Sequence, residues 1–167
     1  MKTLICLISL VFVSCAGYQL GGAKPPSLSG VKTITVPMFR NGTLHPRAEA
    51  IATSAVAGAF VTDGTYRIAG EENADAVLEG KVATIEYSNL RSSRLDSSLA
   101  EELVNTVKID WELLDANDRT KVLASGSSEG SSSFYVDSNL QTARQNALPD
   151  AFERAGQKLV SKLALGY

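Results

Sequence analysis

The feature that most limits the possible folds is a strict alternation of side chains over residues 103–113. Every second residue is apolar or an amide, and the residues between them are mostly polar or charged. A period of two predicts a β-strand with one buried face and one wet face. The residues expected to point inward are Leu103, Asn105, Val107, Ile109, Trp111 and Leu113. A sheet built on this strand needs an apolar layer to cover one of its faces.

Two stretches carry apolar residues spaced three and four apart, which is typical of amphipathic helices. The first covers residues 47–61, with Pro46 near its first turn and Asp63-Gly64 at its end. The second begins at a capping box, Ser138-Asn139-Leu140-Gln141, and its stripe continues to Leu163. Pro149 lies within that stripe, so we expect it to kink or split the helix near Leu148.

Further strands are predicted on both sides of the first helix. Residues 31–39 alternate, and Pro37 indicates either an edge position or a bulge near the strand's end. A turn at residues 40–43, a short strand at 65–68, a loop at 70–75 and a strand at 76–87 follow, and residues 88–98 are expected to form a loop. After turn residues 115–118, residues 121–128 are expected to complete a hairpin with 103–113, closed by Gly130-Ser131-Ser132-Ser133.

This order of elements predicts the fold class. A strand, a helix, two or three strands and a final helix imply one right-handed crossover, which places the first two strands parallel. Two amphipathic helices are enough to cover the apolar face of the sheet. We therefore expect an α+β protein, a two-layer α/β sandwich with an about four-stranded mixed sheet packed by two helices.

The N-terminus has the pattern of a secretory signal peptide. Lys2 precedes an apolar run over residues 4–13, which is too short to span a membrane. Ser14 then stands directly before Cys15, an order that resembles a bacterial lipobox, although Phe12 replaces the usual Leu or Val. We expect cleavage before Cys15 and acylation of its thiol and amine, which would anchor the protein durably. The alternative is an ordinary signal peptide with a chance cysteine.

The expected organisation is a signal peptide at 1–14, an acylated N-terminus and tether at 15–30, and a single globular domain at 31–167. The 167 residues suit one domain. Cys6 lies in the signal peptide, so no disulfide is expected. Removal of Lys2 changes the formal net charge from −2 to −3, which gives no electrostatic basis for binding nucleic acid.

The sequence offers little for catalysis, and neither a cofactor nor a metal is expected. Residues 126–130 spell G-x-S-x-G around Ser128, but a nucleophile elbow needs a strand-to-helix turn and a later histidine, whereas His45 lies upstream. Glu71, Glu72 and Asp75 lack the spacing of a calcium loop. A pair of glycosidase carboxylates stays open, because their separation is a property of the fold.

Several short motifs are similar to one family. They are Cys15-Ala16-Gly17-Tyr18-Gln19-Leu20, the stretch VKTITVPMFRNGT at 31–43, the helix containing Glu49, the stretch DAVLEGKV at 75–82, and the alanine-spaced C-terminal helix. This pattern resembles the LptE-like family of lipopolysaccharide-assembly lipoproteins, in which a C-G-Y-x-L start precedes an I-x-V-P-x-F-x-N-x-T strand and turn. Ala16 replaces the commoner glycine.

The resemblance implies a non-enzymatic lipoprotein of the cell outer membrane that faces the periplasm. Such a protein would sit as a plug inside a β-barrel lipopolysaccharide translocon of the LptD-like kind and help it to assemble and to insert lipopolysaccharide. Lipopolysaccharide itself is a second expected partner, and its phosphates would need cations. The candidates are Arg91 and Arg94, with Lys32 and Arg40 weaker, and the alternative for all four is ordinary solvated charge.

Two other functions remain open. The alternative is a lipid-anchored periplasmic interaction module of another envelope complex, such as a regulator of cell-wall synthesis, because V-P-x-F-x-N-like strands also occur in such domains. A lipid-anchored hydrolase that uses Ser128 ranks last, since the sequence provides no partner for that hydroxyl.

Overall fold

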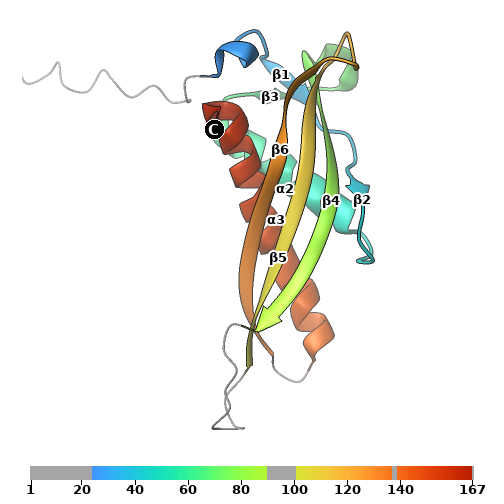
Figure 1. The fold of residues 1–167 in the computed structure, drawn as a ribbon, viewed down its shortest axis with the longest axis vertical. Helices are drawn as coiled ribbons and strands as arrows, with labels where there is room; N and C mark the ends of the chain where they lie inside the picture. The colour runs from blue at the N-terminus through green and yellow to red at the C-terminus, as the bar shows by residue number, and fades with distance from the viewer. Residues whose placement is uncertain (1–23, 90–100, 137–138, 167) are drawn as a thin grey trace, which may run out of the picture.

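The computed structural model describes residues 24–89, 101–136 and 139–166, which form one sheet and the helices that cover it (Figure 1). The strands are β1 (Thr33–Thr35), β2 (Arg40–Asn41), β3 (Arg67–Ile68), β4 (Ala76–Asn89), β5 (Glu101–Asp115) and β6 (Val122–Val136). The α-helices are α2 (Ala48–Asp63) and α3 (Leu140–Leu165), and two single-turn 3₁₀ helices are η2 (Pro26–Leu28) and η3 (Glu71–Asn73).

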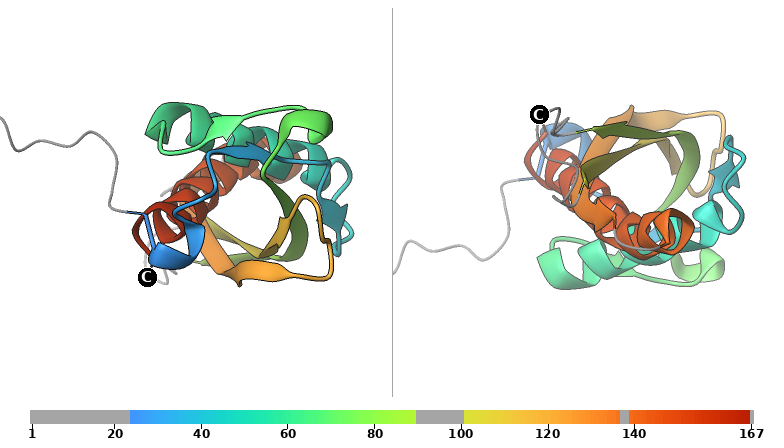
Figure 2. Two further views of the ribbon diagram at one scale, coloured as in Figure 1. Left: turned by 90° about the horizontal axis from the view of Figure 1, so that it is seen from above. Right: turned by 90° about the horizontal axis from the view of Figure 1, so that it is seen from below.

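The predicted α+β sandwich is confirmed, with six strands in place of about four. The strand order is β3-β1-β4-β5-β6, and β2 pairs with β4 beside this path. The first crossover, through α2, makes β1 and β3 parallel as expected, while β4, β5 and β6 form a long antiparallel meander. The sheet is strongly curved, and α3 lies along its concave side (Figure 2).

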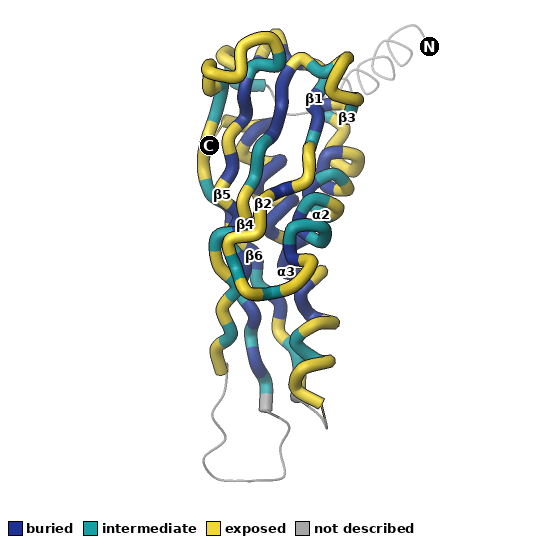
Figure 3. Tube along the Cα trace, turned by 90° about the vertical axis from the view of Figure 1, so that its right-hand side faces the viewer, coloured by how far each residue is buried: buried dark blue, intermediate teal, exposed yellow. Residues whose placement is uncertain are grey.

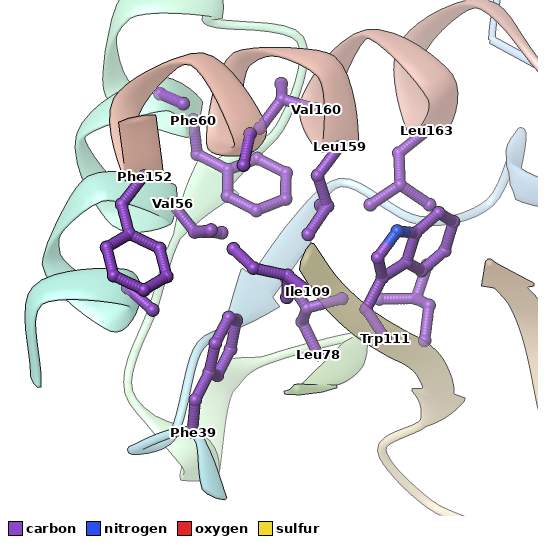
Figure 4. Packing of buried hydrophobic residues seen from close by; sticks show 14 of the residues in the cluster. Phe39, Val56, Phe60, Leu78, Ile109, Trp111, Phe152, Leu159, Val160 and Leu163 are labelled. Carbon is purple, nitrogen blue, oxygen red and sulfur yellow. The ribbon is translucent and has the colours of Figure 1, made fainter. Parts of the chain in front are cut away.

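The core lies between the meander and the two helices. All six inward residues predicted for β5 are buried, which confirms the alternation. Ile109 and Trp111 of this strand lie against Leu159 and Leu163 of α3, and Phe60 of α2 completes the cluster (Figure 4). Along β5, buried residues alternate with less buried ones (Figure 3).

The hairpin strand β6 is longer than predicted. We expected Gly130 to Ser133 to close it, but the strand continues to Val136 and pairs with β5 along its length. The reason is the size of the residues that face α3. A Cβ at Gly130 would lie 2.0 Å from the carbonyl oxygen of Ala151, and the Ser132 hydroxyl donates to the carbonyl of Ala147 at 2.6 Å. The glycine and serine content that indicated a loop instead permits close packing of a helix on a strand.

The helix ends agree partly with the prediction. Gly64 ends α2 in the left-handed conformation, at φ 74°, and its N–H donates to the carbonyl of Phe60. The N-cap of α3 is Asn139, whose side chain accepts a hydrogen bond from the N–H of Thr142 at 3.1 Å. This cap lies one residue later than Ser138, the predicted cap, which is outside the described residues. Of the kink or split expected at Pro149, the split does not occur, because α3 continues through this residue as one helix.

The predicted strand at 31–39 is interrupted. β1 ends at Thr35, and β2 begins at Arg40, within the segment expected to be a turn. Both strands pair with β4, where Thr35 lies opposite Val77 and Arg40 opposite Lys81. The five-residue advance from Thr35 to Arg40 therefore corresponds to a four-residue advance along β4. The extra residue lies within residues 36–39, a segment that contains Pro37 and belongs to neither strand.

The described part of the predicted tether packs against the domain. Leu28 is buried in the core, and the Nζ of Lys24 lies 4.5 Å from the centre of the Tyr66 ring. The Tyr66 hydroxyl donates to the carbonyl of Leu163 at 2.8 Å, and burial raises its pKa to about 12. Residues 24–30 therefore lie beside the C-terminal turns of α3.

Candidate functional site

Of the residues predicted from sequence to act, Cys15, Arg91 and Arg94 lie outside the described residues. Lys32 is exposed just before β1, and its backbone N–H donates to Oδ2 of Asp75 at 2.8 Å. Arg40 is exposed on β2 and forms an ion pair with Glu79, 2.9 Å from Nη2 to Oε2. The charge of Arg40 is therefore already balanced by a neighbouring carboxylate.

Asp75 joins the start of β4 to β1. Its Oδ2 accepts from the N–H groups of Lys32 and Thr33 and from the Thr33 hydroxyl. These hydrogen bonds, with the backbone donors contributing most, hold the pKa of the Asp75 carboxyl below its usual value. This residue of the predicted acidic cluster has a structural role, and Glu71 of the same cluster pairs with Arg119.

A groove with a volume of about 1260 Å³ lies between α2 and α3. It is lined by α2 and the residues before it, by Tyr87 of β4, and by α3 between Gln141 and Gln157. The helices pack closely at Gly156, where an added Cβ would lie 3.2 Å from the carbonyl oxygen of Ala55. Beyond this contact the first turns of α3 extend past α2 (Figure 1).

Three side chains surround Tyr87, which lines one end of the groove. The Cζ of Arg144 lies 4.6 Å from the centre of the Tyr87 ring, and the rings of His45 and Phe134 lie 5.5 and 6.4 Å from it. Burial raises the pKa of Tyr87. Within the described part of the chain, Nε of Arg144 is buried with no hydrogen-bond partner.

This end of the groove has the chemistry of a binding site. Its walls include apolar side chains such as Ile51 and Leu148, and a guanidinium lies beside them. Apolar walls with a few fixed polar groups are typical of sites that bind amphipathic ligands. Sequence reasoning missed this site because Arg144 and Tyr87 come from a helix and a strand far apart in the chain. The one available signal was the small-residue pattern Ser54, Ala55 and Gly58 on α2.

The structure places Ser128 where it has no access to a substrate. This residue is buried in the middle of β6, away from any strand-to-helix turn, and its Oγ accepts from Nε1 of Trp111 at 3.2 Å. Across the described residues, no group of three His, Cys, Asp or Glu side chains is placed to hold a metal ion.

The convex face of the meander is polar. On this face the hydroxyls of Thr106 and Ser131 lie 3.0 Å apart. Exposed residues of the three strands on this side include Lys81, Thr84, Glu86 and Ser88, Asp110 and Glu112, and Ser125, Glu129, Ser133 and Tyr135. The mostly wet face predicted for the strand at 103–113 is confirmed. Neither α-helix in the described ranges is long and apolar enough to cross a membrane.

Comparison with known proteins gives one family. The profile of the family described as LptE, lipopolysaccharide-assembly, matches residues 31–163. No curated protein matches the sequence.

Solved structures share the fold at low sequence identity. A PelC dodecamer from Paraburkholderia phytofirmans is similar with a TM-score of 0.52 and 22% identity, covering 87% of this chain and 94% of that one. A minor lipoprotein from Acinetobacter baumannii has a TM-score of 0.51 and 10% identity, covering 81% and 94%. A hypothetical protein from Chlamydia trachomatis has a TM-score of 0.54 and 5% identity, covering 82% and 99%. At these identities the likeness concerns the fold alone.

Proposed function

Since this chain belongs to the LptE lipopolysaccharide-assembly family, we propose that it is an outer-membrane lipoprotein that plugs a β-barrel lipopolysaccharide translocon. In this role it assists assembly of the barrel and insertion of lipopolysaccharide, without catalysing a reaction. The observation that carries the proposal is the extent of the family match, which covers residues 31–163 and so includes both helices almost completely and every strand.

The polar convex surface of the domain supports the proposed position inside a barrel. The interior of a large barrel is polar and filled with water, so a plug needs a rigid body with a polar face. The convex face of β4, β5 and β6 provides such a face, with hydroxyls and charges of both signs. The curved sheet and the two helices behind it provide the rigidity.

Anchoring completes the proposed arrangement. Acylated Cys15 would hold the protein at the inner surface of the outer membrane, facing the periplasm. A Cys15→Ala variant is expected to lose fatty-acid labelling and to stay uncleaved. Continued labelling of that variant would show that the anchor lies elsewhere.

We propose that lipopolysaccharide is bound directly, and that the groove between α2 and α3 takes part. Apolar walls beside Arg144 suit an acyl chain next to a phosphate, and a buried guanidinium nitrogen with no partner in the described residues is available to an anion. Arg91, Arg94, Lys32 and Arg40 remain proposed additional contacts for phosphate groups. Arg144→Ala should weaken binding of purified lipopolysaccharide by about tenfold, which corresponds to the loss of one charged hydrogen bond. Arg119→Ala, which removes an exposed arginine outside the groove, is the control.

Depletion in the native host tests the role as a whole. Loss of the protein should reduce lipopolysaccharide at the cell surface and leave the barrel misassembled. Normal display after depletion would contradict the proposal. The alternative is that the protein serves another envelope complex, such as one that regulates cell-wall synthesis, and co-purification with a peptidoglycan synthase in place of a barrel would favour it.

A further inference from the structure

The long strand β6 ends the sheet and leaves one side open for pairing. It is the last strand in the order β3-β1-β4-β5-β6, and its other side pairs with β5. In an antiparallel ladder, alternate residues direct both their N–H and their C=O to the same side. The carbonyls of Ser127 and Ser131 accept from side chains of α3. The backbone N–H and C=O groups of these two residues, and of Glu129 between them, therefore point to the open edge.

Two cations from α3 occupy this edge. Nη1 of Arg154 donates to the carbonyl of Ser131 at 3.0 Å, and Nζ of Lys162 donates to the carbonyl of Ser127 at 2.6 Å. Helix and strand run side by side in opposite directions (Figure 1). Eight helical residues rise about 12 Å and four strand residues about 13 Å, so the two spacings agree.

Lys158 lies four residues from both Arg154 and Lys162, so the same spacing places it midway between them, at the level of Glu129 on β6. Arg154, Lys158 and Lys162 recur every four residues and form a cationic row along the edge. With Gln157, Ser161 and Ser131 they line a depression of about 670 Å³. Among the described residues, none of the three cations forms an ion pair with a carboxylate.

The cations of α3 determine which kind of strand can pair with the open edge of β6. A second copy of the chain that paired through β6 would bring a second cationic row to the same seam. Its own residues on the helix side of β6, among them Ser128 and Gly130, would supply no carboxylate. Like charges across a strand pair are destabilising, so self-pairing is disfavoured. A strand with acidic residues at every second position complements the row, because its repeat of about 6.7 Å is close to the helical repeat of about 6 Å.

We propose that the open edge of β6 is a docking site for an extended acidic segment of a partner protein. The segment adds to the sheet as a further strand, and its N–H groups replace Arg154 and Lys162 on the carbonyls of Ser131 and Ser127. The released cations, with Lys158, bind its carboxylates. Main-chain pairing then gives affinity and the alternating carboxylates give specificity. This site does not depend on the barrel role or on the groove.

Synthetic peptides test the proposal on the purified full-length protein. The probe is a seven-residue peptide that alternates threonine and glutamate. One control replaces glutamate by lysine, and another replaces the two inner threonines by proline, which keeps the charge but removes the N–H groups that pair with β6. The glutamate peptide should bind at least about tenfold more tightly than either control, because charge and strand pairing are both needed.

Amide chemical shifts and one variant locate the site. The largest shifts on adding the glutamate peptide should occur at Ser127, Glu129 and Ser131. Lys158→Ala should weaken binding about threefold or more without changing the melting temperature, whereas Lys81→Ala on β4 should leave binding unchanged. Equal binding of the proline peptide, shifts centred on the α2–α3 groove, or no binding at about 10 mM peptide would each overturn the proposal.

Discussion

Replacement of Gly130 by alanine tests how closely α3 is seated on β6. Gly130 faces the helix in the middle of the strand. An added Cβ would lie 2.0 Å from the carbonyl oxygen of Ala151, 2.4 Å from the backbone nitrogen of Ala155 and 3.1 Å from its Cα. All three atoms belong to the backbone of α3, so no side-chain rotation relieves the contact. The helix itself has to move.

The size of the effect follows from these distances. An ordinary contact between heavy atoms is about 3.5 Å, so the helix must move by about 1.5 Å at this point. A radial gap of about 0.5–1 Å already removes a quarter to a half of the dispersion energy of the contacts on either side. Overpacking of a core typically costs about 1–3 kcal/mol. Because the obstacle is backbone, we expect Gly130→Ala to cost about 3 kcal/mol.

Urea unfolding followed by fluorescence measures this cost, because Trp111 is the only tryptophan and is buried beside the affected interface. The melting temperature should fall by about 6–12 °C. Gly58→Ala is the matched control: Gly58 lies within α2 with no atom near its added Cβ, so alanine should stabilise the helix by about 0.5–1 kcal/mol. A Gly130→Ala protein that matches the parent within about 0.5 kcal/mol would refute the packing of α3 on β6.

Three further outcomes are expected. Asn105 is fully buried, and its Nδ2 and Oδ1 have no partner within the described residues, so Asn105→Leu should raise the free energy of unfolding by about 1–3 kcal/mol; a loss would contradict this. Ser128→Ala should cost about 1–3 kcal/mol, because Nε1 of Trp111 loses its acceptor, and should shift the tryptophan emission; unchanged stability and emission would contradict the hydrogen bond. The lowered pKa of Asp75 stabilises the fold above the pKa of the unfolded carboxyl, about 3.9, and this contribution disappears as pH falls through the folded pKa. Asp75→Asn should therefore lower the urea midpoint more at pH 7 than near pH 2, and an equal difference at both pH values would contradict the assignment.

Periodic segments were predictable from sequence because the spacing of their apolar residues indicates which face is buried. The alternation around Ile109 identified β5, and the stripe ending at Asp63-Gly64 identified α2, since a single residue pattern determines the buried face of each element. The parallel pairing of β1 and β3 followed from the handedness of a short crossover.

The predictions that were wrong concern residues whose conformation depends on another element packed against them. Gly130 reads as a loop residue in isolation, and only the backbone of α3 beside it explains why a strand needs no side chain there. Pro149 normally ends a helix, but here the chain continues, with Ala151 and Phe152 of the following turn buried in the core. The tertiary contacts of α3 override the local preference at both positions.

The groove was beyond sequence reasoning for the same reason. Tyr87 lies in the strand predicted at 76–87 and Arg144 in the predicted C-terminal helix, and nothing in their spacing connects them. Of the basic residues selected from sequence, Arg91 and Arg94 lie in an expected loop, Arg40 in an expected turn and Lys32 in an expected strand. Lys32 and Arg40 are described, and Arg40 already pairs with Glu79. The guanidinium nitrogen buried without a partner in the described residues belongs to Arg144.

The most direct test of the proposed role is affinity purification of the tagged protein from detergent-solubilised outer membranes of its native host, with its partners identified and quantified by mass spectrometry. The proposal predicts one β-barrel protein in roughly equal amount to the tagged chain, retained when the membranes are washed with high salt, because a plug is enclosed on most sides. Recovery of a peptidoglycan synthase without a barrel, or of the tagged chain alone, would contradict it.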